Sequence, residues 1–271
     1  MNWLFRDCRG YITAHYLDGV PIEVSGHDYH GRNLYLFGTN DPKVSAVCSA
    51  LLCAGDVFLD IGANHGSIGI QAARMVGLEG AVHLFEPQKE LCERVESALV
   101  ASAYRNAQLH RIGLWNTDGP YSITIPTGHS GIATFEDRVE MVGWPTREVC
   151  EVRDVSTYLP PLIRDRSFAA KVDIEGGAKI IPWLLSQPRL RFLVFEVAHN
   201  QYELYGCVKA VGLTLFGLLR HPFLLRMIRI DDFEEMSQFH DVVAVRIPLD
   251  MANLKRISPT ALARHLNAAA T

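Results

Sequence analysis

One stretch, Val57 to Gly69, constrains the fold of this chain more than any other. It opens with an apolar run, reaches an acid at Asp60 and then carries three glycines within eight residues before a helical pattern begins. An apolar run without polar alternation is typical of a strand buried on both faces, as in parallel sheets. Glycines allow positive φ angles, and a helix start presents unpaired N–H groups. This strand–turn–helix unit predicts a nucleotide-like ligand, and a turn that binds nothing is the alternative.

Strands and helices alternate along the rest of the chain. Further strands are predicted at Ala81–Glu86, Ala107–Ile112, Tyr121–Ile125, Phe168–Asp173, Arg191–Val197, Leu213–Phe216 and Val242–Arg246. Alternation of this kind predicts an α/β fold with a doubly wound, mostly parallel sheet of about seven strands.

Three segments follow from this pattern. Residues 1–54 are predicted to form an N-terminal cap on the substrate side, residues 55–248 the ligand-binding domain, and residues 249–271 a C-terminal helical tail.

The cap and one internal loop carry weaker patterns. Within the cap, Tyr11–Tyr16 and Asn33–Phe37 resemble short strands, and Lys43–Cys53 has apolar positions at helical spacing. Residues 126–150 contain several glycines and prolines, and we expect them to form an irregular binding loop or lid.

Composition excludes several classes of protein. The chain has 271 residues, a hydrophobic fraction of 48% and a net charge of −4 without a basic stripe, which argues against a nucleic-acid partner. No apolar run is long enough for a membrane span, and the first residues do not resemble a signal peptide. The six cysteines lack metal or redox spacing, which favours free thiols in the cytoplasm. A homo-oligomer is compatible with this composition.

Four predicted strands end in acids: Asp60, Glu86, Asp173 and Glu196. Because ligands of open α/β sheets bind outside the carboxyl ends of the strands, these acids should meet at one crevice. Such a crevice repels a pyrophosphate, and no P-loop lysine follows the glycines. Glu86 lies about 20 residues beyond the glycines, where an acid binds ribose hydroxyls. A ligand with a ribose, a positive charge and no phosphate fits best, and S-adenosylmethionine has these features.

Two motifs carry a family resemblance. Asp60-Ile61-Gly62-Ala63-Asn64-His65-Gly66, with Glu86-Pro87 one strand later, resembles class I S-adenosylmethionine-dependent methyltransferases. Lys171-Val172-Asp173-Ile174-Glu175-Gly176-Gly177-Ala178, preceded by residues 150–159, is similar to the FkbM-type O-methyltransferase family. The resemblance covers roughly residues 38–200.

The resemblance implies a seven-stranded, Rossmann-like sheet whose last strand is antiparallel. It implies that Asp60, Gly62, Asn64 and Gly66 surround the methionine part of the cofactor and that Glu86 binds its ribose. Leu114 and Trp115 are implied to lie near the adenine, and Ser67 and Asp173 complete the predicted cofactor contacts.

Methyl transfer to a hydroxyl needs alignment and benefits from a general base. Asp173 is the first candidate for that base, followed by Glu175, Glu196 and His199, and His65 could face the acceptor. An alternative is a Mg²⁺ ion held by Asp173 and Glu196, with His199 or Asn200.

The leading hypothesis is therefore O-methylation of a sugar, glycan or secondary metabolite. N-methylation stays open, although its usual Asn-Pro-Pro-Tyr-type clamp is absent. A nicotinamide-dependent oxidoreductase is an alternative that the glycine spacing disfavours, and a non-catalytic binding partner is another. His129, Trp144 and Tyr202 are candidate liners of the acceptor site.

Overall fold

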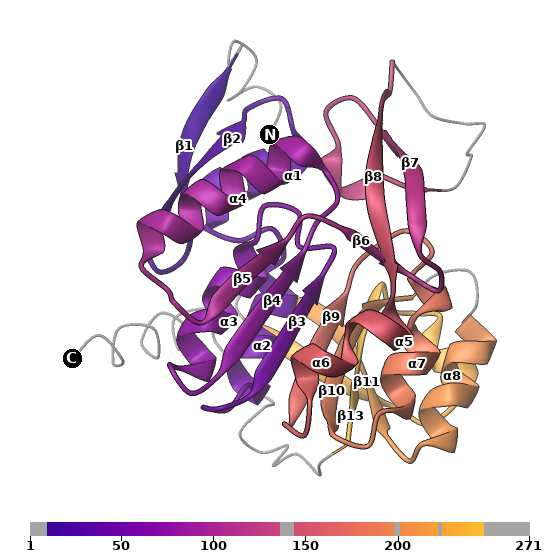
Figure 1. The fold of residues 1–271 in the computed structure, drawn as a ribbon. Coiled ribbons are helices and arrows are strands. Elements are labelled where there is room, and N and C mark those ends of the chain that lie inside the picture. Colours follow the sequence, from indigo (N-terminus) through magenta and orange to yellow (C-terminus); the bar gives the residue numbers. More distant parts are fainter. Residues whose placement is uncertain (1–9, 136–143, 198–200, 222–223, 247–271) are drawn as a thin grey trace.

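The computed structural model describes residues 10–135, 144–197, 201–221 and 224–246. The predicted C-terminal tail and His199 lie outside these residues. Within them, the main sheet has eight strands in the order β12-β11-β13-β10-β9-β3-β4-β5 (Figure 1). Their bounds are β3 Val57–Ile61, β4 Ala81–Phe85, β5 Ala107–His110, β9 Phe168–Val172, β10 Leu190–Glu196, β11 Thr214–His221, β12 Leu224–Ile230 and β13 Asp241–Val245.

The mostly parallel sheet predicted from the sequence is confirmed. Neighbouring strands from β5 to β10 run parallel, and β13, the last strand, pairs antiparallel with β10. β11 pairs antiparallel with β13, so it runs in the direction of β10. The edge strand β12 was not predicted; it forms an antiparallel hairpin with β11.

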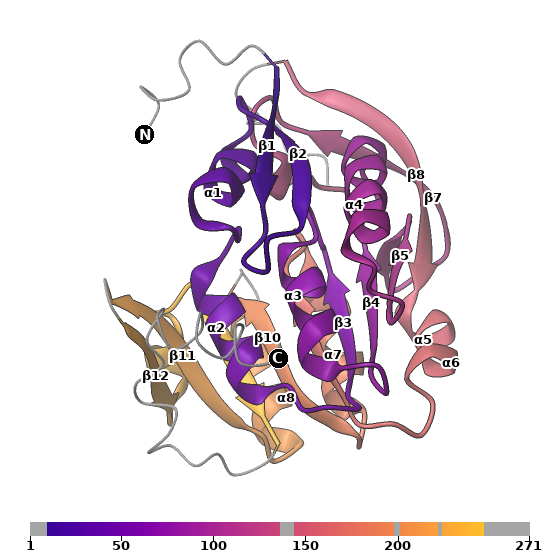
Figure 2. The ribbon, with the colours of Figure 1, turned by 90° about the vertical axis from the view of Figure 1, so that its left-hand side faces the viewer.

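Helices cover both faces of this sheet. Figures 1 and 2 show α2 (Pro42–Leu51), α3 (Ser67–Val76) and α4 (Lys89–Ser102) on one face. The other face carries α5 (Val155–Tyr158), α6 (Pro160–Ile163), α7 (Ile181–Ser186) and α8 (Gln201–Ala210), and α9 (Phe233–Met236) follows β12. In the part of the chain that is described, no helix has the length and apolar character needed to cross a bilayer.

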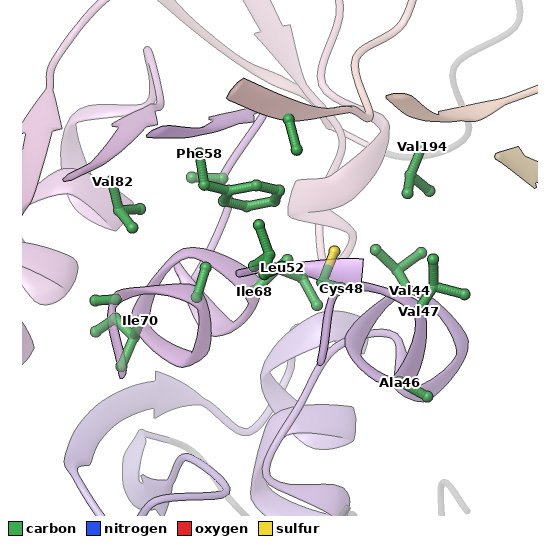
Figure 3. Close-up of a cluster of buried hydrophobic side chains, with 14 of the residues drawn as sticks. Val44, Ala46, Val47, Cys48, Leu52, Phe58, Ile68, Ile70, Val82 and Val194 are labelled. Atoms are coloured by element: carbon green, nitrogen blue, oxygen red, sulfur yellow. The ribbon is translucent and has the colours of Figure 1, made fainter. Parts of the chain in front are cut away.

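The alternation of side chains along β3 divides the core into two layers. Phe58 packs in the cluster that includes α2 and α3, where it lies near Ile68 and Val82 (Figure 3). Leu59 and Ile61 point to the opposite cluster, under α5 to α8. Because all five residues of β3 are buried, the acid Asp60 is carried into the interior on the α3 side.

In the segment predicted as an N-terminal cap, the described residues form a hairpin, β1 (Tyr11–His15) and β2 (Pro21–Ser25), followed by helix α1 (Tyr29–Phe37). The predicted strand at Asn33–Phe37 is therefore wrong. Asp28 caps the helix by accepting the N–H of Gly31, and Gly38, at φ +70°, donates its N–H to Leu34 O. These two end signals, with Leu34 fully buried, outweigh the strand-like composition of the segment.

A second sheet, in the order β6-β8-β7, stands beside the main one. It comprises β6 (Gly113–Trp115), β7 (Gly119–Ile125) and β8 (Thr146–Asp154). The predicted irregular loop at 126–150 is thus wrong for residues 146–150, which begin β8. Most side chains of β8 are exposed and only Cys150 and Val152 are buried, so its charged composition concealed the strand.

Asp28 links the cap to the segment after β7, because it also accepts hydrogen bonds from the N–H and hydroxyl of Ser130, at 2.7 and 3.1 Å.

We predict that Asp28→Ala lowers the free energy of unfolding by about 2–4 kcal/mol, through loss of a cap and of charge-assisted hydrogen bonds. Urea denaturation followed by circular dichroism measures this. Asp232→Ala, which removes the single hydrogen bond of the exposed N-cap of helix α9, should cost about 1 kcal/mol or less. Equal losses in the two variants would contradict the linking role.

Candidate functional site

A cavity of about 510 Å³ lies at the carboxyl ends of the central strands. Its walls come from the turn after β3, the end of β4, the first turn of α1, the segment around η1 (Ser130–Ile132), and the ends of β9 and β10. The cap and the second sheet enclose the crevice that the sequence predicted at this edge.

The glycine turn forms the floor of the cavity. Gly62 has φ +76°, and a Cβ there would stand 2.1 Å from Asp173 O, so only glycine fits. Asp60 lies beneath the turn and accepts the N–H of Gly69, in the first turn of α3, at 2.8 Å. Asp60 is fully buried and does not line the cavity.

Lys171 holds this floor together. Its ammonium group lies 3.2 Å from Asp60 Oδ1 and 3.3 Å from Asp173 Oδ2, and it donates a hydrogen bond to Gly62 O at 2.7 Å. Burial lowers the pKa of Lys171, but the two carboxylates outweigh burial and the net shift is upward. Sequence reasoning missed this residue, although a lysine inside the apolar strand Phe168–Val172 signals a buried ion pair.

Glu86 forms the wall at the end of β4. Its carboxylate accepts the N–H of Asn64 at 2.8 Å and the N–H of Gln88 at 2.9 Å. Burial raises the pKa of Glu86 to about 7. Asn64 has φ +50°, which presents its N–H to Glu86. The two acids of the first motif therefore differ in place: Asp60 lies under the turn, and Glu86 faces the cavity.

Ser130 joins three walls of the cavity. Besides its bonds to Asp28, its hydroxyl accepts from Asn64 Nδ2 at 3.0 Å and its carbonyl accepts from Gln88 Nε2 at 3.0 Å. Tyr29 and His129 stack beside it, with ring centroids 5.0 Å apart. No sequence motif marked Ser130, because its three partners come from distant parts of the chain.

The far end of the cavity carries alternating charges. Glu196 Oε1 lies 3.0 Å from His240 Nε2, and His240 Nδ1 lies 3.3 Å from Asp241 Oδ1. Asp241 in turn forms an ion pair with Lys43 of α2. Burial, followed by the charge of Asp173, raises the pKa of Glu196 to about 7.

The structure brings together most of the predicted site residues. Gly62, Asn64, Ser67, Glu86, Asp173, Glu175, Glu196 and His129 line the cavity.

Several predicted residues lie elsewhere. Gly66 is at the N-cap of α3, where it packs against Leu84 and Val95, and His65 is buried. Trp144 is 93% exposed and, like Tyr202, does not line the cavity.

Leu114 and Trp115 also stand outside the lining, because β6 turns both side chains into the core. The apolar part of the cavity wall, near β7 and η1, is formed instead by Ile123, Ile132, Ala133 and Phe135. Phe135 packs edge-on against Trp115, with centroids 5.8 Å apart, so Trp115 supports the wall from behind.

The magnesium alternative gains no support. Among the described residues there is no group of three or more His, Cys, Asp or Glu side chains arranged to hold a metal ion. Asp173 pairs with Lys171, and Glu196 pairs with His240.

The chain matches known proteins by structure only. Neither a protein-family model nor a curated protein sequence matches it. Similar solved structures include a precorrin-6y C5,15-methyltransferase from Geobacter metallireducens (11% identity, 78% of this chain and 92% of that chain, TM-score 0.42). An O-methyltransferase of tomaymycin synthesis from Streptomyces achromogenes has 12% identity over 76% of this chain and 79% of that chain, with a TM-score of 0.43.

A third similar structure is described as a putative tRNA (m1A22) methyltransferase from Streptococcus pneumoniae (10% identity, 78% of this chain and 77% of that chain, TM-score 0.41). At these identities and TM-scores the structural similarities identify neither a reaction nor an acceptor.

We predict that Lys171→Met lowers the free energy of unfolding by about 3–5 kcal/mol, because it leaves Asp60 charged and buried without its cation. Chemical denaturation measures the loss, and Lys89→Met, on an exposed helix start, should change stability by about 0.5 kcal/mol or less. The double variant Asp60→Asn/Lys171→Met should recover part of the loss. If Lys171→Met is as stable as the Lys89 control, the ion pair does not hold the turn.

Proposed function

We propose that this chain is an S-adenosylmethionine-dependent methyltransferase that methylates a hydroxyl group of a small acceptor such as a sugar or a secondary metabolite. The observation that carries the proposal is the division of roles between two acids. Asp60 occupies a first-turn N–H of α3, and Glu86 faces the cavity one strand away. The ligand best suited to this pair has a ribose and no phosphate.

The runner-up, a nicotinamide-dependent oxidoreductase, fits less well. A dinucleotide places its pyrophosphate at the helix start after the first strand. Here the Asp60 carboxylate already accepts the N–H of Gly69, so one of the backbone donors that a phosphate would use at this helix start is taken. The two lysines of the lining, Lys43 and Lys171, both form ion pairs with carboxylates.

In the proposed reaction the methyl carbon leaves the cofactor sulfur and bonds to the acceptor oxygen, which loses its proton. The chain's contribution is to align the two atoms and exclude water, which can supply about 7–11 kcal/mol at best. Asp173 and Glu175, both in the lining, are the carboxylates we propose to orient the acceptor hydroxyl. This assignment extends the resemblance to FkbM-type O-methyltransferases, whose second motif contains both positions.

Calorimetric titration with S-adenosylhomocysteine tests the cofactor. We predict binding by the native chain and an affinity loss of about tenfold to a hundredfold in Glu86→Ala, which removes a charged acceptor for the ribose hydroxyls. Glu79→Ala changes an exposed residue just before the amino end of β4, away from the cavity, and should leave the affinity for S-adenosylhomocysteine unchanged. Failure to bind S-adenosylhomocysteine, together with tight binding of NAD, would refute the proposal.

A glycine pair tests the floor of the cavity. Gly62 and Gly77 both have positive φ, but a Cβ at Gly62 meets Asp173 O, whereas at Gly77 it meets nothing within 4 Å. We predict that Gly62→Ala weakens S-adenosylhomocysteine binding by about tenfold or more and that Gly77→Ala leaves it intact. Thermal unfolding of both variants separates loss of binding from loss of the fold. Equal binding by both would place the ligand away from this turn.

A further inference from the structure

Glu196 ends β10 with its side chain in the cavity wall, and His240 backs it at 3.0 Å. The Glu196 side chain is 40% exposed and the His240 side chain is 72% exposed, so the pair leads from the cavity wall toward solvent. Asp241 and Lys43 continue the row of alternating charges behind His240. A carboxylate in the cavity thus contacts a solvent-facing imidazole, which is the arrangement needed to move a proton out of the site.

The groups around Glu196 favour proton uptake near neutral pH. Asp173 and Glu175, after β9, and Asp241, at the start of β13, add negative charge that raises its pKa, while His240 opposes them. Two other cavity carboxylates already have partners that stabilise their ionised form: Asp173 is paired with Lys171, and Glu86 accepts two backbone N–H groups.

The proposed reaction changes the charge of the ligands. Before transfer the cofactor carries a sulfonium cation. When the C–S bond breaks, its electron pair stays on sulfur, the C–O bond forms, and the acceptor O–H bond gives up a proton. The thioether product has no positive charge at sulfur, so a proton retained by a cavity carboxylate replaces the charge that the cofactor has lost.

We propose that Glu196 receives the proton of the acceptor hydroxyl and that His240 passes it to solvent. This inference rests on the proposed function and replaces Asp173 as the first candidate for the base. The protonation of Glu196 should therefore differ between the two cofactor forms even without an acceptor. Binding of S-adenosylhomocysteine, which lacks the sulfonium charge, favours protonated Glu196, whereas binding of S-adenosylmethionine favours the ionised form.

Calorimetry in buffers of different ionisation enthalpy measures the protons taken up on binding. At pH 7, S-adenosylhomocysteine should bind with uptake of up to about half a proton at Glu196, and S-adenosylmethionine should not. Glu86 contacts the ribose of both ligands in the proposed pose, so its titration cancels in the comparison. Glu196→Gln should abolish the difference between the ligands, and Glu79→Gln, which removes an equal charge at the far edge, should preserve it.

His240→Gln provides a second variant that leaves Glu196 in place. Because His240 lowers the pKa of Glu196, its loss should move the pH of the largest difference upward by about one unit. Equal proton uptake with both ligands, a difference that survives Glu196→Gln, or an unmoved pH in His240→Gln would overturn the inference. If neither ligand binds the native chain, it is the proposed function that fails.

Discussion

The ammonium group of Lys171, buried between Asp60 and Asp173, is the interaction on which the site depends. It ties β3 to β9 at the edge where the ligand would bind, and its bond to Gly62 O fixes the glycine turn from below. Because one cation serves two carboxylates, the turn can carry an acid beneath it without leaving an isolated buried charge. The position of Asp173 at the cavity therefore depends on the same contact as the shape of the floor.

The cavity changes character from one end to the other. Near β7 and η1 its wall is apolar, with Ile132 and Phe135, and near β10 and β13 it is charged, with Glu196 and His240. This polarity matches a ligand with an aromatic base at one end and a cation at the other, which is how the proposed cofactor is built. Ser130 closes the middle by joining the cap, the glycine turn and the start of α4.

Local patterns predicted the main sheet and the strand-end acids, because neighbouring residues alone determine a buried strand and a glycine turn. The helix at Tyr29–Phe37 is also marked locally, by its Asp28 and Gly38 caps, but the strand-like composition of the segment indicated a strand. Features that depend on distant partners were not predictable: the inward direction of Leu114 and Trp115 follows from how β6 pairs with β8. Lys171, Ser130 and His240 acquire their roles from contacts with residues that the topology brings together.

In the proposed function the cavity binds the adenosine cofactor of a methyltransferase, with Glu86 on its ribose. A crystal structure of the chain with S-adenosylhomocysteine tests it most directly. We expect the ribose hydroxyls on the Glu86 carboxylate, the base against Ile132 and Phe135, and the sulfur over Gly62, facing Asp173 and Glu196. Density for the ligand outside this cavity, or with its ribose away from Glu86, would rule out this mode of binding.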